Sequence, residues 1–180
     1  MKKLLMVIPL ALILCFVVSC QDKEAMAELK AMKAQDKVEA QNKAIILRWL
    51  NEVNESNFDL LSEELFAPDC EQYMPPDAEP MSFEEYKQLI KQFYSAFPEI
   101  MHTADDMIVE GDKVVARITA HTVHEREFFG RPPTGKELKW TAIAIFQLAD
   151  GKIKTRWEIA DMLSLFEQLG MELRLKEAAK

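Results

Sequence analysis

The residue whose type and position best suit a chemical role is Asp161. Two runs of alternating apolar and polar residues flank the turn at Ala149-Asp150-Gly151, which predicts a β-hairpin. In the second run Ile153, Trp157 and Ile159 share a face, and the alternation, continued by two residues, places Asp161 on that face. Burial without a partner raises the pKa of a carboxyl group, which suits general acid/base catalysis. The pattern therefore predicts an acid/base residue beside an apolar wall.

A structural role for Asp161 is the alternative. We expect a helix from Met162, and an aspartate just before a helix caps its free amide groups. A cap favours the ionised carboxylate, whereas an apolar wall favours the protonated acid. Both interpretations stay open. The opposite face of the same run is charged and is expected to meet solvent or an interface: Lys152, Lys154, Arg156 and Glu158.

His124 is the histidine that the pattern places in a cavity. The run from 113 to 127 alternates, and one face is small and apolar until it ends in the histidine: Val114, Ala116, Ile118, Ala120, Thr122 and His124. Such a face describes the inner wall of a cavity, and a buried structural histidine is the alternative. The following strand carries its own apolar face: Leu138, Trp140, Ala142, Ala144 and Phe146. We expect His102 and His121 at the surface or at an edge.

Composition and motifs exclude several classes of site. The chain has three histidines, without H-x-H or H-x-x-x-H spacing and without paired carboxylates at helical spacing near them, which argues against a metal site. There is no G-x-S-x-G motif and no phosphate-cradling glycine motif, so no nucleotide cofactor is indicated. A formal net charge of −8 argues against nucleic-acid binding.

The rest of the domain is predicted as helices followed by strands. Apolar residues at helical spacing indicate a helix from about residue 38 to 53, a short helix over 59–66 and a third helix from Ser82 to Tyr94. The stretch Ser82-Phe83-Glu84-Glu85 resembles a capping box that is one residue short of its ideal register. From Met101 the period changes to two and predicts a second hairpin.

The order and spacing of several short pieces resemble the SnoaL-like polyketide cyclase (ester cyclase) family. The pieces are RWLNEVNESNFDLLSEELFAPD, FPEIMHTADDMIVEGDKVVARITAHTVH, FFGRPPTGK, WTAIAIF, ADGKI and WEIADMLSLFEQLG, and together they span roughly residues 41 to 171. The resemblance implies an α+β fold of the nuclear-transport-factor-2-like type. In such a fold a cone-shaped, curved, mostly antiparallel sheet wraps around N-terminal helices and leaves a pocket in the cone.

The resemblance also implies a site. The aspartate of the family's W-x-x-x-D pattern maps onto Asp161, which would act as acid and base in a cofactor-free intramolecular aldol ring closure. His124 and Trp157 would shape and polarise the site. Tyr73 stands where many family members carry a histidine, and its hydroxyl would serve as the donor instead. Two further aromatic residues are candidates for substrate contact, Trp140 and Trp49, although Trp49 lies at helical spacing, where aromatic residues more often belong to the core.

Residues 1–19 have the pattern of a secretory signal peptide, with Lys2 and Lys3 before an apolar run that is too short to span a membrane. Ser19 before Cys20 resembles a bacterial lipobox, which implies cleavage before Cys20 and lipidation of this cysteine. Residues 20–37 would then be a charged spacer and residues 38–180 the SnoaL-like domain. We expect an exported, membrane-anchored lipoprotein, in the outer membrane if the organism is Gram-negative, because Gln21 follows the cysteine. An uncleaved anchor helix is the alternative.

Two functions remain open at this point. The first is an enzyme that cyclises or isomerises a small carbonyl compound such as a polyketide. The second is a non-catalytic envelope lipoprotein that binds a small apolar ligand or a protein partner. The apolar outer face with Thr141, Ile143 and Ile145 predicts a homodimer. Cys70, the cysteine left in the mature domain, is expected to be a buried packing residue.

Overall fold

A computed structural model of the 180-residue chain describes residues 7–74 and 79–172, with side chains from residue 23 onward. The chain divides into two units, Met1–Val38 and Glu39–Lys180. The described residues form four helices and six strands: α1 (Val7–Glu52), α2 (Phe58–Leu65), β1 (Phe66–Tyr73), β2 (Met81–Ser82), α3 (Phe83–Ala96), β3 (Met101–Glu110), β4 (Lys113–Val123), β5 (Glu137–Ala149), β6 (Lys152–Ala160) and α4 (Met162–Gln168).

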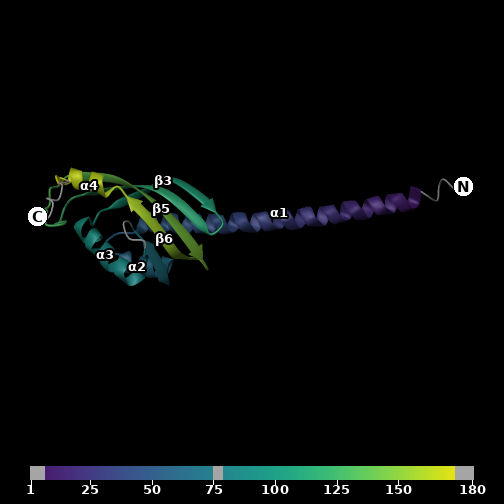
Figure 1. Cartoon of the computed structure of the whole chain (residues 1–180), viewed down its shortest axis with the longest axis horizontal. Helices are drawn as coiled ribbons and strands as arrows, with labels where there is room; N and C mark the ends of the chain where they lie inside the picture. Colours follow the sequence, from purple (N-terminus) through teal and green to yellow (C-terminus); the bar gives the residue numbers. More distant parts are fainter. Residues whose placement is uncertain (1–6, 75–78, 173–180) are drawn as a thin grey trace, which may run out of the picture. The chain divides into compact units, whose positions relative to one another are not determined.

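One curved, open sheet dominates the second unit (Figure 1). Its strand order is β2-β1-β6-β5-β4-β3, and β1 runs parallel to β6 while the other neighbours are antiparallel. Two hairpins, β3–β4 and β5–β6, supply four of the strands. The second turn has Asp150 at φ 52° and Gly151 at φ 74°, as a tight hairpin turn requires. The expected α+β cone fold with a mostly antiparallel sheet is confirmed.

The hydrophobic core lies against the inner faces of β4 and β5. The residues that alternate on these two strands are at most 9% exposed: Val114, Ala116, Ile118, Ala120, Leu138, Trp140, Ala142, Ala144 and Phe146. This confirms the two inner faces expected from the sequence. Figure 1 shows α2 and α3 together on one side of the sheet, and the end of α1 contributes buried Ile46, Trp49 and Leu50 to the same core. Burial of these side chains provides most of the driving force for folding.

A β-bulge interrupts β6. Gln147 pairs with Thr155 and Leu148 pairs with Ile153, so Lys154 is an extra residue opposite β5. Side chains of a strand alternate strictly between faces, and one extra residue exchanges the two faces for the rest of the strand.

The bulge overturns the expected faces of β6. Ile153 is buried before the bulge, and Arg156 is the buried residue after it, at 7% exposure, whereas Ile159 is 68% exposed. The expectation that Arg156 and Glu158 meet solvent, while Trp157 and Ile159 share the inner face with Ile153, is therefore wrong.

A second bulge lies in edge strand β3. Ala104 pairs with Ile118 and Asp106 pairs with Arg117, which leaves Asp105 as the extra residue. The guanidinium of Arg117 contacts both carboxylates, at 2.9 Å from Asp105 and 2.6 Å from Asp106. The faces of β3 exchange at this point as well.

Helix α3 starts with a complete capping box. The Ser82 hydroxyl accepts a hydrogen bond from the Glu85 amide at 3.3 Å, and the Glu85 carboxylate accepts one from the Ser82 amide at 2.9 Å. The expectation of a register one residue short is thus wrong, because serine and glutamate are three positions apart as the motif requires.

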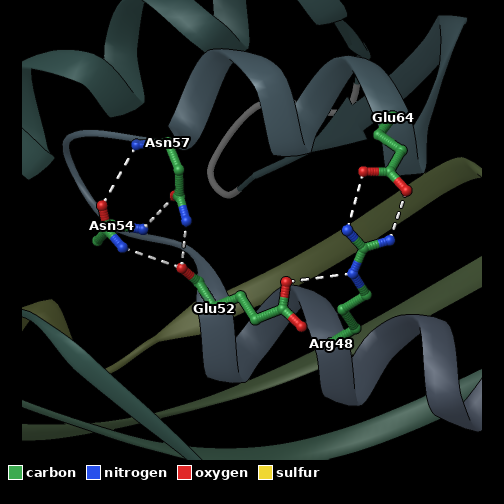
Figure 2. A network of polar contacts seen from close by, with 5 residues as sticks. All are labelled: Arg48, Glu52, Asn54, Asn57 and Glu64. Carbon is green, nitrogen blue, oxygen red and sulfur yellow. Dashed lines mark hydrogen bonds and ion pairs between the residues drawn. The ribbon is translucent and has the colours of Figure 1, made fainter.

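A polar network fixes the chain reversal between α1 and α2 (Figure 2). Arg48 donates two hydrogen bonds to Glu64 at 2.5 and 2.9 Å and one to Glu52 at 3.1 Å. The side-chain amides of Asn54 and Asn57 donate to the backbone carbonyl of Glu52 at 3.1 and 2.6 Å. The network satisfies a carbonyl at the end of α1 and directs the chain into α2.

The N-terminal expectations concern the first unit. Among the residues that the structure describes, no helix has the length and apolarity needed to cross a bilayer. Residues 23–37 belong to α1 and are exposed. Lys2 and Lys3 lie outside the described residues, and the side chain of Cys20 lies outside the described side chains, so signal peptide and lipidation stay predictions.

Candidate functional site

A cavity of about 570 Å³ lies between the inner face of the sheet and helices α1 and α3. Its wall is largely apolar and aromatic, and includes Trp49, Leu50, Ile90, Phe93, Ile118, Phe128, Trp140 and Ala142. Cavities of this size and lining are typical of small-molecule sites. Two of the predicted substrate-contact residues, Trp49 and Trp140, thus lie in the cavity wall.

An ion pair interrupts this apolar wall. Arg156 and Glu158 both line the cavity, and the guanidinium Nη2 of Arg156 donates to a carboxylate oxygen of Glu158. Their side chains are 8% and 16% exposed. Nη1 of Arg156 donates to the hydroxyl of Tyr86 at 2.9 Å, and the guanidinium also lies over the rings of Tyr86 and Phe146. The bulge at Lys154 is what turns this pair inward.

Two side chains in the cavity wall have unused hydrogen-bonding atoms. Nε of Arg156 and Nδ1 of His102 are buried without a hydrogen-bond partner among the described residues, and both side chains line the cavity. Most buried polar groups in proteins are hydrogen-bonded, so each exception calls for an explanation. A bound ligand could satisfy both groups, with an oxygen acceptor at Nε of Arg156 and with an acceptor or a donor at Nδ1 of His102, according to the tautomer of the ring.

His102 lies on edge strand β3, in agreement with the expected edge position, and its side chain lines the cavity. It pairs with Ala120 on the inner face of β4, beyond the bulge at Asp105. Burial, together with the nearby positive charge of Arg156, lowers the pKa of its imidazole from 6.5 to about 4. The ring is therefore neutral at neutral pH and can accept or donate a hydrogen bond without carrying charge.

Two tyrosines add hydroxyl groups to the cavity wall. Tyr86 and Tyr94 are buried on α3, and burial raises the pKa of both phenols. Arg156 acts in the opposite direction on both, but burial is the larger effect. Both hydroxyls therefore stay protonated and can donate to a ligand oxygen.

Asp161 caps helix α4. Its carboxylate accepts a hydrogen bond from the Ser164 amide at 3.0 Å, and the residue is exposed. Its neighbours Ala160 and Met162 line the cavity, whereas Asp161 does not. The expected place of Asp161 on the apolar face is wrong, because the bulge turns it outward. Its catalytic role stays a prediction.

His124 is fully buried, but it does not line the cavity. Its Nδ1 lies 3.1 Å from the hydroxyl of Thr134, and its ring packs beside Phe97. Its other ring nitrogen, Nε2, is buried without a hydrogen-bond partner among the described residues. Its catalytic role also stays a prediction.

Asp161 and His124 do not meet. The Asp161 amide donates to Thr141 at 2.8 Å and the His124 amide to Lys136 at 2.9 Å. These two acceptors are five positions apart along an extended chain, which corresponds to about 17 Å at about 3.4 Å per residue. The two side chains cannot contact one atom of a bound ligand across this distance.

Tyr73 and Trp157 contact each other instead of the cavity. They pair between β1 and β6, and their rings stack at 5.4 Å between centroids and 16° between planes. Trp157 is also the partner of Ile145 on β5, which places the stacked pair on the outer face of the sheet. Neither residue lines the cavity.

Cys70 is 1% exposed in the core, as expected of a packing residue. Its thiol accepts a hydrogen bond from the side-chain amide of Gln72 at 3.0 Å. Burial raises the pKa of this thiol to about 11, so the thiolate that a nucleophile needs is scarce at neutral pH. No group of three or more histidine, cysteine, aspartate or glutamate residues in the described part of the chain is arranged to hold a metal ion.

The residues that sequence reasoning missed are Arg156, Glu158, Tyr86, Tyr94 and His102. One signal was available: Arg156 and Glu158 are two positions apart and must share a face of β6. Which face they share depends on the bulge, which the alternation of residues does not reveal.

Comparison with known proteins identifies the family. The model of the SnoaL-like polyketide cyclase family matches residues 44–169. None of the curated proteins is a significant match to this chain.

Solved structures agree with the fold. AclR from Streptomyces galilaeus, described as a proposed hydroxylase, has a TM-score of 0.67 at 26% identity, over 73% of this chain and 97% of its own. IdmH from Streptomyces antibioticus, described as a proposed polyketide cyclase, has a TM-score of 0.66 at 29% identity, over 73% and 99%. A proposed polyketide cyclase from Acidithiobacillus ferrooxidans has a TM-score of 0.63 at 25% identity, over 72% and 94%.

These similar structures carry descriptions of different reactions, so the fold alone does not name the chemistry. The family match covers more than half of the chain, including the whole sheet, helices α2, α3 and α4, and the end of α1. This chain belongs to the SnoaL-like polyketide cyclase family.

Proposed function

We propose that the cavity binds a small, largely apolar carbonyl compound such as a polyketide, and that the protein catalyses a cofactor-free cyclisation or isomerisation of it. In a cyclisation of the intramolecular aldol type, a base removes a proton beside one carbonyl group. The resulting enolate carbon attacks a second carbonyl of the same molecule, and the new alkoxide takes up a proton. The reaction needs a proton acceptor, hydrogen-bond donors for the charged oxygen, and exclusion of water.

The observation that carries this proposal is a buried ion pair in the wall of a largely apolar cavity. Aromatic side chains such as Phe93 and Trp140 suit the body of a polyketide-like ligand, and the hydroxyls of Tyr86 and Tyr94 suit its carbonyl oxygens. Polar groups placed sparsely in an apolar site orient a ligand.

The proposal is tested with the purified full chain in mild detergent and 2-tetralone, a bicyclic ketone with an acidic C–H group beside its carbonyl. Proton NMR in D2O follows the exchange of that hydrogen for deuterium. We expect exchange to accelerate in the presence of the protein and to saturate as the 2-tetralone concentration rises. Saturable binding without acceleration would contradict the catalytic proposal.

That contrary outcome would support the second candidate function, a binding module. The observation that favours it is the position of Asp161, which acts as a helix cap outside the cavity wall. A protein that only binds needs the apolar cavity and its polar groups but no proton acceptor. Ligands that copurify with the protein would then show what it carries.

We also propose that the chain is exported and anchored to a membrane through lipidated Cys20. The support is the sequence pattern of residues 1–20 and the charged, exposed stretch over residues 23–37, which suits a spacer. Mass spectrometry of the protein from a bacterial host is expected to find a lipid-modified N-terminal cysteine. Cys20→Ser should abolish the modification and release the protein from the membrane fraction. An unmodified Met1 in the wild-type protein would contradict the proposal.

A homodimer through the outer face of the sheet is a further proposal. Register pairs form an apolar row across five strands: Tyr73, Trp157, Ile145, Val115 and Ile108. Ile108 in this row is 69% exposed, and Ile143, two positions from Ile145 on β5, is 54% exposed. Exposed apolar patches of this kind mark interaction sites. Sedimentation in detergent is expected to show a dimer that Ile145→Lys converts to a monomer, and a wild-type monomer would refute the proposal.

A further inference from the structure

Stability does not explain the ion pair in the cavity wall. Arg156 and Glu158 are both almost buried, and they line a cavity whose other walls are mostly apolar. Removing two charges from water is unfavourable, and apolar residues of similar volume at such positions are often equally or more stabilising. The pair also leaves a buried donor, Nε of Arg156, without a hydrogen-bond partner among the described residues. A ligand that accepts from this donor explains the pair better than stability does.

The Arg156–Glu158 pair and neighbouring Tyr86 have both unused hydrogen-bond donors and an unused hydrogen-bond acceptor. In the bond with Arg156 the hydroxyl of Tyr86 accepts, so its own hydrogen remains available to a ligand. Nε of Arg156 is a second available donor. Glu158 is the more exposed partner of the ion pair, at 16% against 8%, and a carboxylate has more acceptor sites than one guanidinium nitrogen can fill.

The geometry points to Glu158 as the proton-abstracting base of this cavity, with the Arg156 guanidinium and the Tyr86 hydroxyl binding the oxyanion that forms. This inference rests on the proposed function, since it names the catalytic residues of that same site. The ligand is a ketone or related carbonyl compound with an acidic C–H group next to the carbonyl, and an apolar ring system that fills the aromatic part of the cavity.

The proton transfer is balanced without any other reactant. The C–H bond breaks, and its proton goes to a carboxylate oxygen of Glu158. The electron pair of that bond becomes the C=C bond of an enolate, and the carbonyl π pair moves onto the oxygen. Negative charge thus passes from Glu158 to the ligand oxygen while the guanidinium of Arg156 stays beside both.

The constant net charge is the physical advantage of this arrangement. Before the step the ion pair consists of one guanidinium and one carboxylate, and after it the same guanidinium faces one enolate while the carboxyl group of Glu158 is neutral. Preorganised donors at the developing charge are usually the largest single contribution to catalysis, because they need no reorganisation in the reaction. Asp161, three positions further along, is exposed, caps α4 and does not line the cavity.

The test compares variants of the full chain in the 2-tetralone exchange experiment, with the dissociation constant of 2-tetralone measured in parallel. For Glu158→Gln we expect the exchange rate to fall by at least about 100-fold, as for loss of a general base. The dissociation constant should stay nearly unchanged, because the amide fills the same space. For Tyr86→Phe we expect a fall on the order of 100-fold, as for loss of an oxyanion donor.

Three further variants make the result specific. Glu64→Gln changes the glutamate of the exposed pair with Arg48 and is the matched control, with no effect expected on exchange. Asp161→Asn decides between the two carboxylates of this segment, and we expect exchange to persist because asparagine also caps helices. The double variant R156Q/E158Q replaces the ion pair by neutral amides, so that a folded protein without the base is available even if Glu158→Gln unfolds.

Each result of the exchange experiment decides between these assignments. Exchange by the wild type that persists in both Glu158→Gln and R156Q/E158Q overturns the inference and leaves the proposed function standing. Exchange that is lost in Asp161→Asn but kept in Glu158→Gln also overturns it, in favour of Asp161. If the wild type binds 2-tetralone and does not accelerate its exchange, the proposed catalytic function fails and the inference fails with it.

Discussion

Two arginines of this domain pair with glutamates in very different surroundings. Arg48 lies between α1 and α2 with its side chain 41% exposed, and it contacts Glu52 and Glu64, which are 51% and 56% exposed (Figure 2). Arg156 lies on β6 with its side chain 8% exposed, and it contacts Glu158 at 16%. The chemical groups are the same, so the comparison isolates the effect of burial.

Burial determines how far each charge acts. Water and salt screen the exposed pair, and such pairs add little to stability. Arg156 acts on neighbours that water does not screen: its charge is among the causes that lower the pKa of His102 and that oppose the raised pKa values of Tyr86 and Tyr94. One network thus orders a chain reversal at the surface, and the other sets the electrostatics of a cavity.

The largest expected loss of stability follows from removing one partner of the buried Arg156–Glu158 pair. Glu158→Ala leaves the guanidinium of Arg156 without its carboxylate in a site that water hardly reaches. Loss of one partner of a buried pair lowers the free energy of unfolding by about 3–5 kcal/mol. Urea denaturation followed by circular dichroism measures the change. The double variant R156M/E158L, which removes both charges, should recover most of it. Equal effects of Glu158→Ala and Glu64→Ala would abolish the contrast between the pairs.

The second prediction concerns the pKa of His102, which burial and, to a smaller extent, the positive charge of Arg156 lower. The pKa of this histidine is about 4 in the folded protein against 6.5 in the reference state, so between these values the unfolded chain binds a proton that the folded chain does not. Stability from His102 is complete above pH 6.5 and falls as the pH decreases toward 4, by on the order of 3 kcal/mol at about 1.4 kcal/mol per pKa unit.

Denaturation of the wild type and of His102→Gln at several pH values between 4 and 7 measures this effect. The difference between the two curves isolates His102 from the carboxylates that titrate in the same range. We expect the wild type to lose more stability than the variant on acidification. Parallel curves would mean that the imidazole takes up a proton as readily in the folded protein as in the unfolded chain. In that case neither burial nor the charge of Arg156 would lower the pKa of His102.

A third carboxylate tests whether exposure alone predicts a small effect. Asp161 is exposed like Glu64, but its oxygen accepts a hydrogen bond from a free helix amide. Asp161→Ala should therefore lower the free energy of unfolding by about 1 kcal/mol, the usual effect of losing a helix cap. Asp161→Asn should restore most of this loss. If Asp161→Ala abolished deuterium exchange without any loss of stability, the capping role would be secondary and the catalytic prediction for Asp161 would be correct.

Much of the fold could be predicted because its elements obey simple periods. The alternating faces of β4 and β5, the turn at Asp150-Gly151 and the buried stripe around Trp49 follow from residue spacing in the sequence. The SnoaL-like resemblance supplied what spacing does not contain, namely that the strands form a curved sheet around helices. The capping box of α3 could also have been read correctly, since its serine and glutamate are at the required spacing.

The polar residues that β6 adds to the cavity wall could not be predicted, for one physical reason. Arg156 and Glu158 both lie beyond the β-bulge at Lys154. A bulge exchanges the two faces of a strand, and the alternation of apolar and polar residues along the strand does not show where the extra residue lies. The same exchange turned Asp161 outward and made it a cap. Bulges are frequent beside active sites, which is why a strictly periodic reading fails there.

The smallest expected effect belongs to the exposed network. In Arg48→Ala the carboxylates of Glu52 and Glu64 return to water, where they need no partner. The chain reversal keeps the hydrogen bonds from the side chains of Asn54 and Asn57 to the carbonyl of Glu52, which do not depend on Arg48. We therefore expect the urea midpoint to stay within experimental error at high salt and to fall only slightly at low salt, where screening is weakest. Urea titrations at two sodium chloride concentrations measure this, and 2-tetralone exchange should be unaltered. A loss as large as that of Glu158→Ala, independent of salt, would show that the network in Figure 2 acts as a buried pair does and that exposure is not what separates the two arginines.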